Sequence, residues 1–145
     1  MAQIVLDMDG TFVDLYKVNG WLEDLRAERT RPYEEAEPMY DMDDFNAIIN
    51  MLRENGHKVI IVSWGSKTAT KEYNRRIRKA KVEWLNRHGV VVDEIHVVKY
   101  GTPKSYMVKG EATLFDDEEQ NRRKWLRGDT VDATQNILEI LKAYV

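Results

Sequence analysis

One short apolar run that ends in an acid constrains the fold of this chain more than any other feature. The segment 3–6 ends in three consecutive apolar residues before Asp7, which is typical of a strand buried on both faces. Residues 58–63 contain four consecutive β-branched residues and predict a second strand of this kind. Between them, apolar residues at helical spacing predict a helix over 42–54. Strand, helix and strand in this order form the unit that builds parallel sheets.

The same alternation continues to the C-terminus. A length of 145 residues suits one domain with one core. We therefore predict a single α/β domain over 1–145, a doubly wound, three-layer, Rossmann-like parallel sheet with helices on both faces. The segment 90–92 is predicted either to pair as a strand or only to pack. The remaining predicted elements are helices over 67–88, 118–126 and 136–143 and strands over 94–98, 113–115 and 130–133.

The segment 12–39 interrupts this regular pattern. It carries Pro32 and Pro38, a glutamate-rich patch and one short amphipathic stretch. A connection of this length inside a compact domain is usually functional, as a lid or a binding loop. We predict that residues 12–39 form a minimal lid inserted after the first strand.

Composition excludes several classes of function. The chain has no cysteine, which removes disulfides, thiolate metal sites and thiol nucleophiles. Its 22 basic and 25 acidic residues give a net charge of −3, too balanced to indicate nucleic-acid or membrane binding by bulk charge. No apolar run has the length of a membrane span. The first residues lack an export signal, so we expect a cytoplasmic protein with no membrane partner.

The predicted strands end in polar residues, and their types suit phosphoryl transfer. Because the carboxyl ends of parallel strands meet at one edge of a sheet, these residues are expected to lie together. Two acids two positions apart can face one substrate, one attacking phosphorus and the other protonating the leaving oxygen. Further acids supply the oxygen ligands that Mg²⁺ prefers, and a hydroxyl and an ammonium can hold phosphate oxygens. The residues are Asp7 and Asp9, Ser63, Lys104, and Asp116 with Asp117.

The order of these residues resembles the four motifs of the haloacid dehalogenase-like (HAD) superfamily. "DMDGT" follows the first strand, Ser63 ends the second, Lys104 lies downstream, and "LFDD" follows a later strand. The resemblance runs from about residue 3 to residue 121. It implies that Asp7 is the nucleophile and that Asp9 is the acid and base, which also binds Mg²⁺ through its backbone carbonyl.

The resemblance assigns the remaining residues as well. It implies that Ser63 and Lys104 bind phosphate, with Trp64 beside them, and that Asp116 or Asp117 completes the metal ligands. The small insert is similar to that of phage- and bacterial-type nucleotide or polynucleotide phosphatases. A Mg²⁺-dependent phosphomonoester hydrolase is therefore expected, acting on a phosphorylated small molecule, a nucleotide or a nucleic-acid end. The alternatives are a binding or regulatory protein with negligible turnover, and a phosphotransferase to an acceptor other than water.

The sequence also allows other assignments for some of these residues. An EF-hand calcium loop is excluded, because its twelfth position, a glutamate in such loops, is Val18. Lys99 and Lys109 compete with Lys104 for the phosphate, although Pro103 favours a helical turn that aims Lys104 inward. Trp64 can stack on a ring or merely pack.

The helix over 67–88 is strongly basic, and we interpret its charges as a solvated outer face. The alternative is a rim that attracts a nucleotide or a nucleic-acid end. The basic residues are Lys67, Lys71, Arg75, Arg76, Arg78, Lys79, Lys81 and Arg87.

Overall fold

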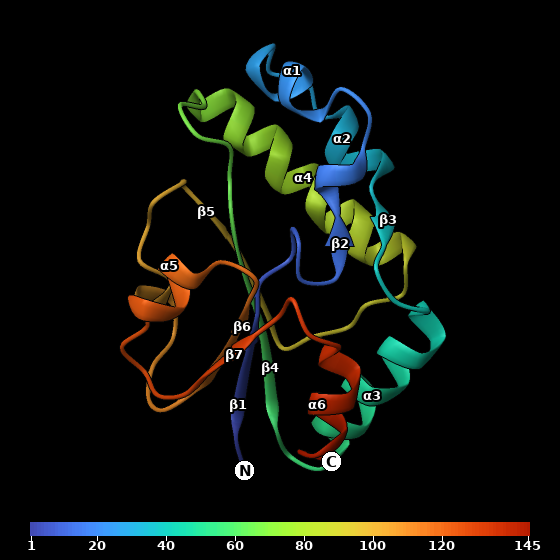
Figure 1. Ribbon diagram of the computed structural model, residues 1–145, viewed down its shortest axis with the longest axis vertical. Helices are drawn as coiled ribbons and strands as arrows, with labels where there is room; N and C mark the ends of the chain where they lie inside the picture. The colour runs from blue at the N-terminus through green and yellow to red at the C-terminus, as the bar shows by residue number, and fades with distance from the viewer.

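A five-stranded, fully parallel sheet forms the centre of the computed structural model, which describes residues 1–145 (Figure 1). Its order is β5-β4-β1-β6-β7, so the chain moves outward from β1 in one direction and then in the other. This reversal is the doubly wound arrangement that the sequence predicts. The strands are β1 (Gln3–Leu6), β4 (Lys58–Trp64), β5 (Glu94–Val98), β6 (Thr113–Asp116) and β7 (Thr130–Asp132).

Side-chain alternation along the strands divides the core between the two faces of the sheet. Ile4 and Leu6 face a large cluster with α3 (Met42–Glu54), α6 (Ile137–Lys142) and the end of α4 (Lys71–Arg87). Val5 faces a smaller cluster that includes Trp125, next to α5 (Glu119–Arg123). Figure 1 shows α3 and α6 on one side of the sheet and α5 on the other. None of the helices combines the length and the apolar composition needed to cross a bilayer.

The helix predicted over 67–88 begins four residues later than expected. Thr70 caps α4, because its Oγ1 accepts a hydrogen bond from the Tyr73 amide at 3.1 Å. The carboxylate of Glu28 in turn accepts from both the amide and the hydroxyl of Thr70. Residues 65–70 therefore form a loop beside the end of β4, and the prediction wrongly placed residues 67–70 of this loop in the helix.

Two smaller predictions also need correction. The helix expected over 118–126 is only α5, because Trp125 turns into the core and donates its indole N–H to the Ala112 carbonyl at 3.0 Å. The segment 90–92 does not pair as a strand, and Val90 packs in the core instead.

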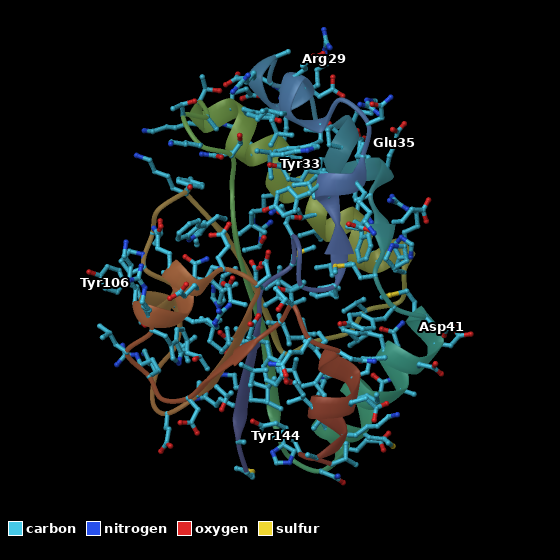
Figure 2. All side chains as sticks on the ribbon, in the orientation of Figure 1. Arg29, Tyr33, Glu35, Asp41, Tyr106 and Tyr144 are labelled. Atoms are coloured by element: carbon cyan, nitrogen blue, oxygen red, sulfur yellow. The ribbon has the colours of Figure 1, made fainter.

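The 12–39 insert folds into short elements that pack on α4. It contains β2 (Val13–Asp14), η1 (a 3₁₀ turn, Leu15–Lys17), α1 (Trp21–Arg26), α2 (Arg31–Glu35) and β3 (Glu37–Pro38). Leu15 and Tyr33 form a buried cluster with Tyr73, Ile77 and Ala80 of α4. Tyr33 points inward from α2 (Figure 2). The insert is thereby seated above the carboxyl end of the sheet.

Candidate active site

Lys104 joins the ends of β1 and β6 in one buried cluster. Pro103 precedes a 3₁₀ turn, η2 (Lys104–Met107), which directs this lysine inward. Its Nζ donates to Asp7 Oδ1 and to Asp116 Oδ2, both at 2.8 Å. Burial alone would lower the pKa of Lys104, but these two carboxylates outweigh burial and raise it. Lys99 and Lys109 are exposed, so Lys104 is the lysine that contacts Asp7.

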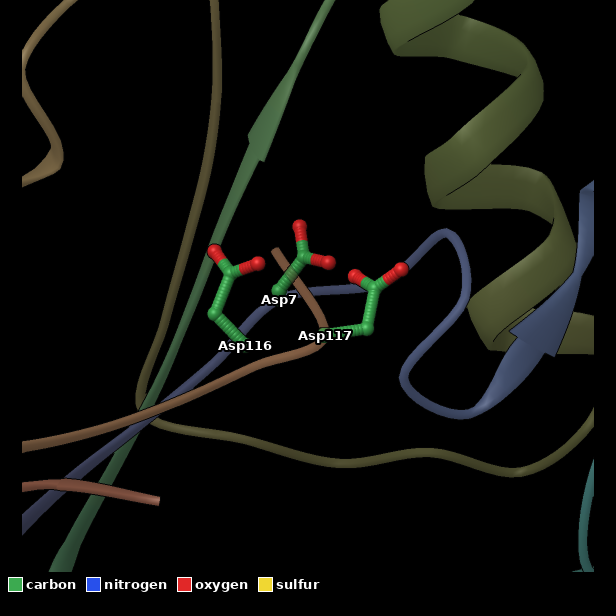
Figure 3. A group of neighbouring side chains, drawn as sticks. All are labelled: Asp7, Asp116 and Asp117. Carbon is green, nitrogen blue, oxygen red and sulfur yellow. The ribbon is translucent and has the colours of Figure 1, made fainter. Parts of the chain in front are cut away.

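Three carboxylates gather beside this lysine. Oxygens of Asp7, Asp116 and Asp117 lie within 4.8 Å of one another. Figure 3 shows the carboxyl groups turned to the same side of the strand ends. Burial, and next the charge of Asp7, raise the pKa of Asp117 to about 8. Since only one ammonium faces three carboxylates, the cluster has the excess negative charge that suits a divalent cation.

Asp116 and Asp117 differ in how their oxygens are used. Asp116 Oδ2 accepts from Lys104 and, at 3.1 Å, from Asn121 Nδ2, while its Oδ1 accepts from the Glu118 amide at 2.9 Å. Asp117 Oδ1 is buried and has no hydrogen-bond partner. A buried carboxylate oxygen without a donor is costly unless a cation faces it. Asp7 and Asp117 are therefore suited to bind a metal ion, whereas Asp116 is suited to hold the ammonium of Lys104 in place.

Gly10 makes room for Asp117. Its φ of +82° is in the left-handed region, and a Cβ built there would lie 2.2 Å from Asp117 Oδ2. The glycine of the "DMDGT" segment therefore serves both the backbone turn and the close approach of a carboxylate. Thr11, the next residue, donates its hydroxyl to Asp7 Oδ2 at 3.1 Å.

A second buried lysine, Lys81, contacts Asp9. Its Nζ donates to Asp9 Oδ2 at 2.8 Å, to Ser63 Oγ at 2.6 Å and to the Trp64 carbonyl at 2.8 Å. Lys81 is 1% exposed, so the prediction that it belongs to the solvated face of α4 is wrong. The other basic residues of that stretch are exposed as expected.

The carboxyl edge of the sheet opens into a cavity of about 430 Å³. Asp7, Asp9 and Lys104 line its polar base, and Ser63, Asp116 and Asp117 belong to the hydrogen-bonded and carboxylate clusters around them. We name these six residues the floor. Two aromatic pairs, which we name the aromatic wall, line the sides. Tyr16 and Trp21 of the insert have ring centroids 5.1 Å apart, and Trp64 and Tyr100 have centroids 4.8 Å apart. The cavity thus combines a charged base with ring-shaped surfaces.

Trp64 faces this cavity with its ring rather than with its indole nitrogen. The indole N–H donates to the Thr102 carbonyl at 2.8 Å, and the ring lies 5.5 Å from Lys104 Nζ. A cation over an aromatic face is favourable, so Trp64 also helps to hold Lys104.

The structure brings together every site residue predicted from the sequence, and it adds residues that the sequence reading missed. One feature of the sequence could have indicated that Lys81 is buried. It lies one helical turn after Ile77, on the apolar stripe of α4. Asn121 lies in α5, the helix that directly follows Asp117, and no sequence pattern distinguished it. Tyr16, Trp21 and Tyr100 come from a 3₁₀ turn, the first residue of a six-residue helix and a loop. These segments are too short for a periodic pattern to mark the side that faces inward.

Comparisons with known proteins agree with the fold. No protein-family model and no curated protein sequence matches this chain. Among solved structures it is similar to a D,D-heptose 1,7-bisphosphate phosphatase from B. bronchiseptica complexed with magnesium and phosphate, at 14% identity and a TM-score of 0.58 over 100% of both chains. The phosphatase of the same name from Burkholderia thailandensis is similar at 11% identity and a TM-score of 0.58 over 99% of both chains. These likenesses confirm the predicted fold along the whole chain.

Proposed function

We propose that this protein is a Mg²⁺-dependent phosphatase that hydrolyses phosphomonoesters through an aspartyl phosphate on Asp7. The observation that carries the proposal is the contact of Lys104 with Asp7 and Asp116. Asp117 lies beside these carboxylates, and Lys81 joins Asp9 to Ser63 at the same edge of the sheet. The likeness of the fold to two phosphatases supports it. Carboxyl groups and a lysine ammonium at the switch point of a parallel sheet are suited to bind one anion and to react with it.

In the first step, an Asp7 carboxylate oxygen attacks phosphorus while the bond to the leaving oxygen breaks. Asp9 gives its proton to that oxygen, so the alcohol leaves neutral. In the second step, water attacks the phosphorus of the aspartyl phosphate, and Asp9 takes a proton from it. The bond to Asp7 then breaks, which releases inorganic phosphate and restores both carboxyl groups. Ser63 and Lys104 hold the phosphate oxygens.

The site residues also fit a magnesium ion. Asp7, Asp117 and the backbone carbonyl of Asp9 would hold it, and Asp116 would keep Lys104 in place. When bound, the ion supplies positive charge that offsets the repulsion between a carboxylate nucleophile and a phosphate dianion. The unpartnered Asp117 Oδ1 and the raised pKa of this residue support the assignment.

The aromatic wall favours a substrate with a flat ring, and we propose a nucleotide. A cavity of about 430 Å³ is within the usual size of small-molecule sites. With phosphate at Asp7, the rings of Tyr16, Trp21, Trp64 and Tyr100 surround the part of the substrate beyond the ester. Offset stacking on such rings is typical of base recognition.

A substrate panel with Mg²⁺ tests the proposal. It should contain mononucleotides, 3′-phosphorylated oligonucleotides and sugar phosphates, with phosphate release as the readout. We expect turnover to be highest on mononucleotides, and Asp7→Asn to reduce it on the order of 10⁴-fold or more. No release from any substrate, with no change in Asp7→Asn, would favour a binding or regulatory protein. Transfer to an added alcohol in place of release would favour a phosphotransferase.

Trapping separates the nucleophile from the substrate question. Beryllium fluoride mimics a phosphoryl group on aspartate, so it should bind the wild-type protein only with Mg²⁺ present. Asp7→Asn should not bind it under either condition. Binding that is independent of Asp7 would contradict the assigned nucleophile.

A further inference from the structure

Lys81 is the one buried charged residue next to the floor that the proposed chemistry does not use. It lies in the middle of α4, between Ala80 and Val82, and its ammonium reaches Asp9, Ser63 and the Trp64 carbonyl. Burying an ammonium is costly unless it is paired and its hydrogen bonds are satisfied. The neighbouring buried positions of α4 are occupied by apolar residues, namely Ala80, Trp84 and Leu85. An apolar residue would therefore suit position 81 if the ammonium had no function.

All three donors of this ammonium have partners within the protein. A lysine has three N–H donors and no acceptor, and Lys81 contacts three acceptors at 2.6 to 2.8 Å. No donor is left for a phosphate oxygen. Lys81 therefore differs from Lys104, whose two hydrogen bonds leave one donor for a ligand.

The contact with Ser63 occupies a lone pair of the hydroxyl oxygen and leaves its proton unused. Because Lys81 can only donate, Ser63 Oγ accepts at 2.6 Å, and the Ser63 proton is free to point elsewhere. The contact with Asp9 leaves Oδ1 of that carboxyl group as the oxygen without a lysine. Lys81 thus binds Oδ2 of Asp9 and one lone pair of Ser63 Oγ. It leaves Oδ1 of Asp9 and the hydroxyl proton of Ser63 available.

We propose that Lys81 is a positioning residue that holds Asp9 in place as the acid for the leaving group. The inference rests on the proposed phosphatase function. The Tyr33 ring, from α2 of the insert, covers the same ammonium with its centroid 5.0 Å from Nζ. Asp9, Ser63, the Trp64 carbonyl and the Tyr33 ring therefore surround Lys81 from the β1 loop, β4 and the insert.

The test compares leaving groups of different basicity. p-Nitrophenolate is stable as an anion and needs little help from an acid, whereas an alkoxide must be protonated as it leaves. We expect Lys81→Met to slow aspartyl-phosphate formation from an alkyl phosphate on the order of 10²-fold, with a much smaller change for p-nitrophenyl phosphate. Rapid-quench measurement of the first turnover gives both rates. The matched control is Lys79→Met on the same helix, whose side chain is 78% exposed.

An equal loss on both substrates, or no loss on either, would overturn the inference. The Asp9→Asn background gives a second test, because residues that act as a unit are not additive. There, Lys81→Met should cause less than a twofold further loss with the alkyl phosphate; a further loss near 10²-fold would also overturn it.

Failure to fold is separated from the proposed role by Lys81→Arg. A guanidinium keeps the charge but cannot make three contacts from one nitrogen. We therefore expect Lys81→Arg, like Lys81→Met, to lose more activity on the alkyl phosphate than on p-nitrophenyl phosphate. If Lys81→Arg shows equal losses, the inference is wrong. The proposed function itself fails only if the wild-type protein has no phosphatase activity, which the same assay reports.

Discussion

The floor and the insert side of the aromatic wall surround the same cavity but are held by different forces. The floor stands on β1, β4 and β6, whose aliphatic residues are fully buried in a hydrogen-bonded parallel sheet. Tyr16 and Trp21 stand on a 3₁₀ turn and a six-residue helix, and both remain partly exposed. With the proposed function, the rigid floor is suited to the chemical step and the wall to recognition of the group attached to the phosphate.

The largest effect is expected in the floor, where Asp116 and Asp117 can be compared. Asp117→Asn removes the carboxylate with the unpartnered oxygen, so Mg²⁺ affinity should fall at least about 10²-fold. Isothermal titration with Mg²⁺ measures this loss. Asp14→Asn, in the nearby β2 strand, is the control and should bind Mg²⁺ like the wild type. If Asp116→Asn abolished binding and Asp117→Asn did not, the assignment would be reversed.

Metal removal should make the stability of the floor depend on pH. Burial and Asp7 raise the pKa of Asp117 to about 8 from 3.8, so the folded protein holds a proton that the unfolded chain releases more easily. Without metal, this contribution is present below about pH 4 and is lost as the pH rises toward 8. Melting in EDTA from pH 5 to 9 should therefore show a falling Tm.

Two controls isolate Asp117 in that experiment. Asp117→Asn should flatten the decline and melt above the wild type at pH 8 in EDTA, because the repulsion with Asp7 is gone. Saturating Mg²⁺ should restore the wild-type Tm at high pH. A decline that persists in Asp117→Asn would assign the pH dependence to another group.

A smaller and selective effect is expected in the aromatic wall. Trp21→Ala removes one ring of the insert pair, and an aromatic contact contributes about 0.5–1.5 kcal/mol. KM for a mononucleotide should rise about two- to tenfold, with kcat nearly unchanged, while a ring-free phosphomonoester should show no change. Tyr106→Ala is the control, since Tyr106 is exposed on the side of the molecule away from Tyr33 (Figure 2). Equal losses on both substrates would contradict recognition of a ring.

The smallest effect is expected on the outer face of α4. Arg78→Gln should change turnover of mononucleotides and of 3′-phosphorylated oligonucleotides by less than about twofold, because exposed charges interact weakly. Assays at low and high salt provide the measurement. A loss confined to oligonucleotides and enlarged at low salt would instead identify this face as a nucleic-acid rim.

The same contrast explains what could be predicted from the sequence. The floor was predictable because each strand is a short apolar run, and the pairing of β1 with β6 brings residues such as Asp7 and Asp116 together. The internal structure of the insert was not predictable, because helices of five or six residues are too short for a periodic pattern to show which side faces inward. Lys81 was missed because a lysine among seven other basic residues is indistinguishable from a solvated one by composition.

Helix α1 carries Trp21 to the cavity, and ion pairs within the insert hold it in addition to the packing of Leu25 against the α4 cluster. The only buried residue of α1 is Asp24, which pairs with Arg29 at 3.2 Å and with Arg31. Dissolved salt screens such partly exposed pairs but does little to apolar packing of the kind that holds β1. Rising ionic strength should therefore loosen the rim of the cavity while its base keeps its shape, so that salt acts on substrate capture before it acts on the chemical step.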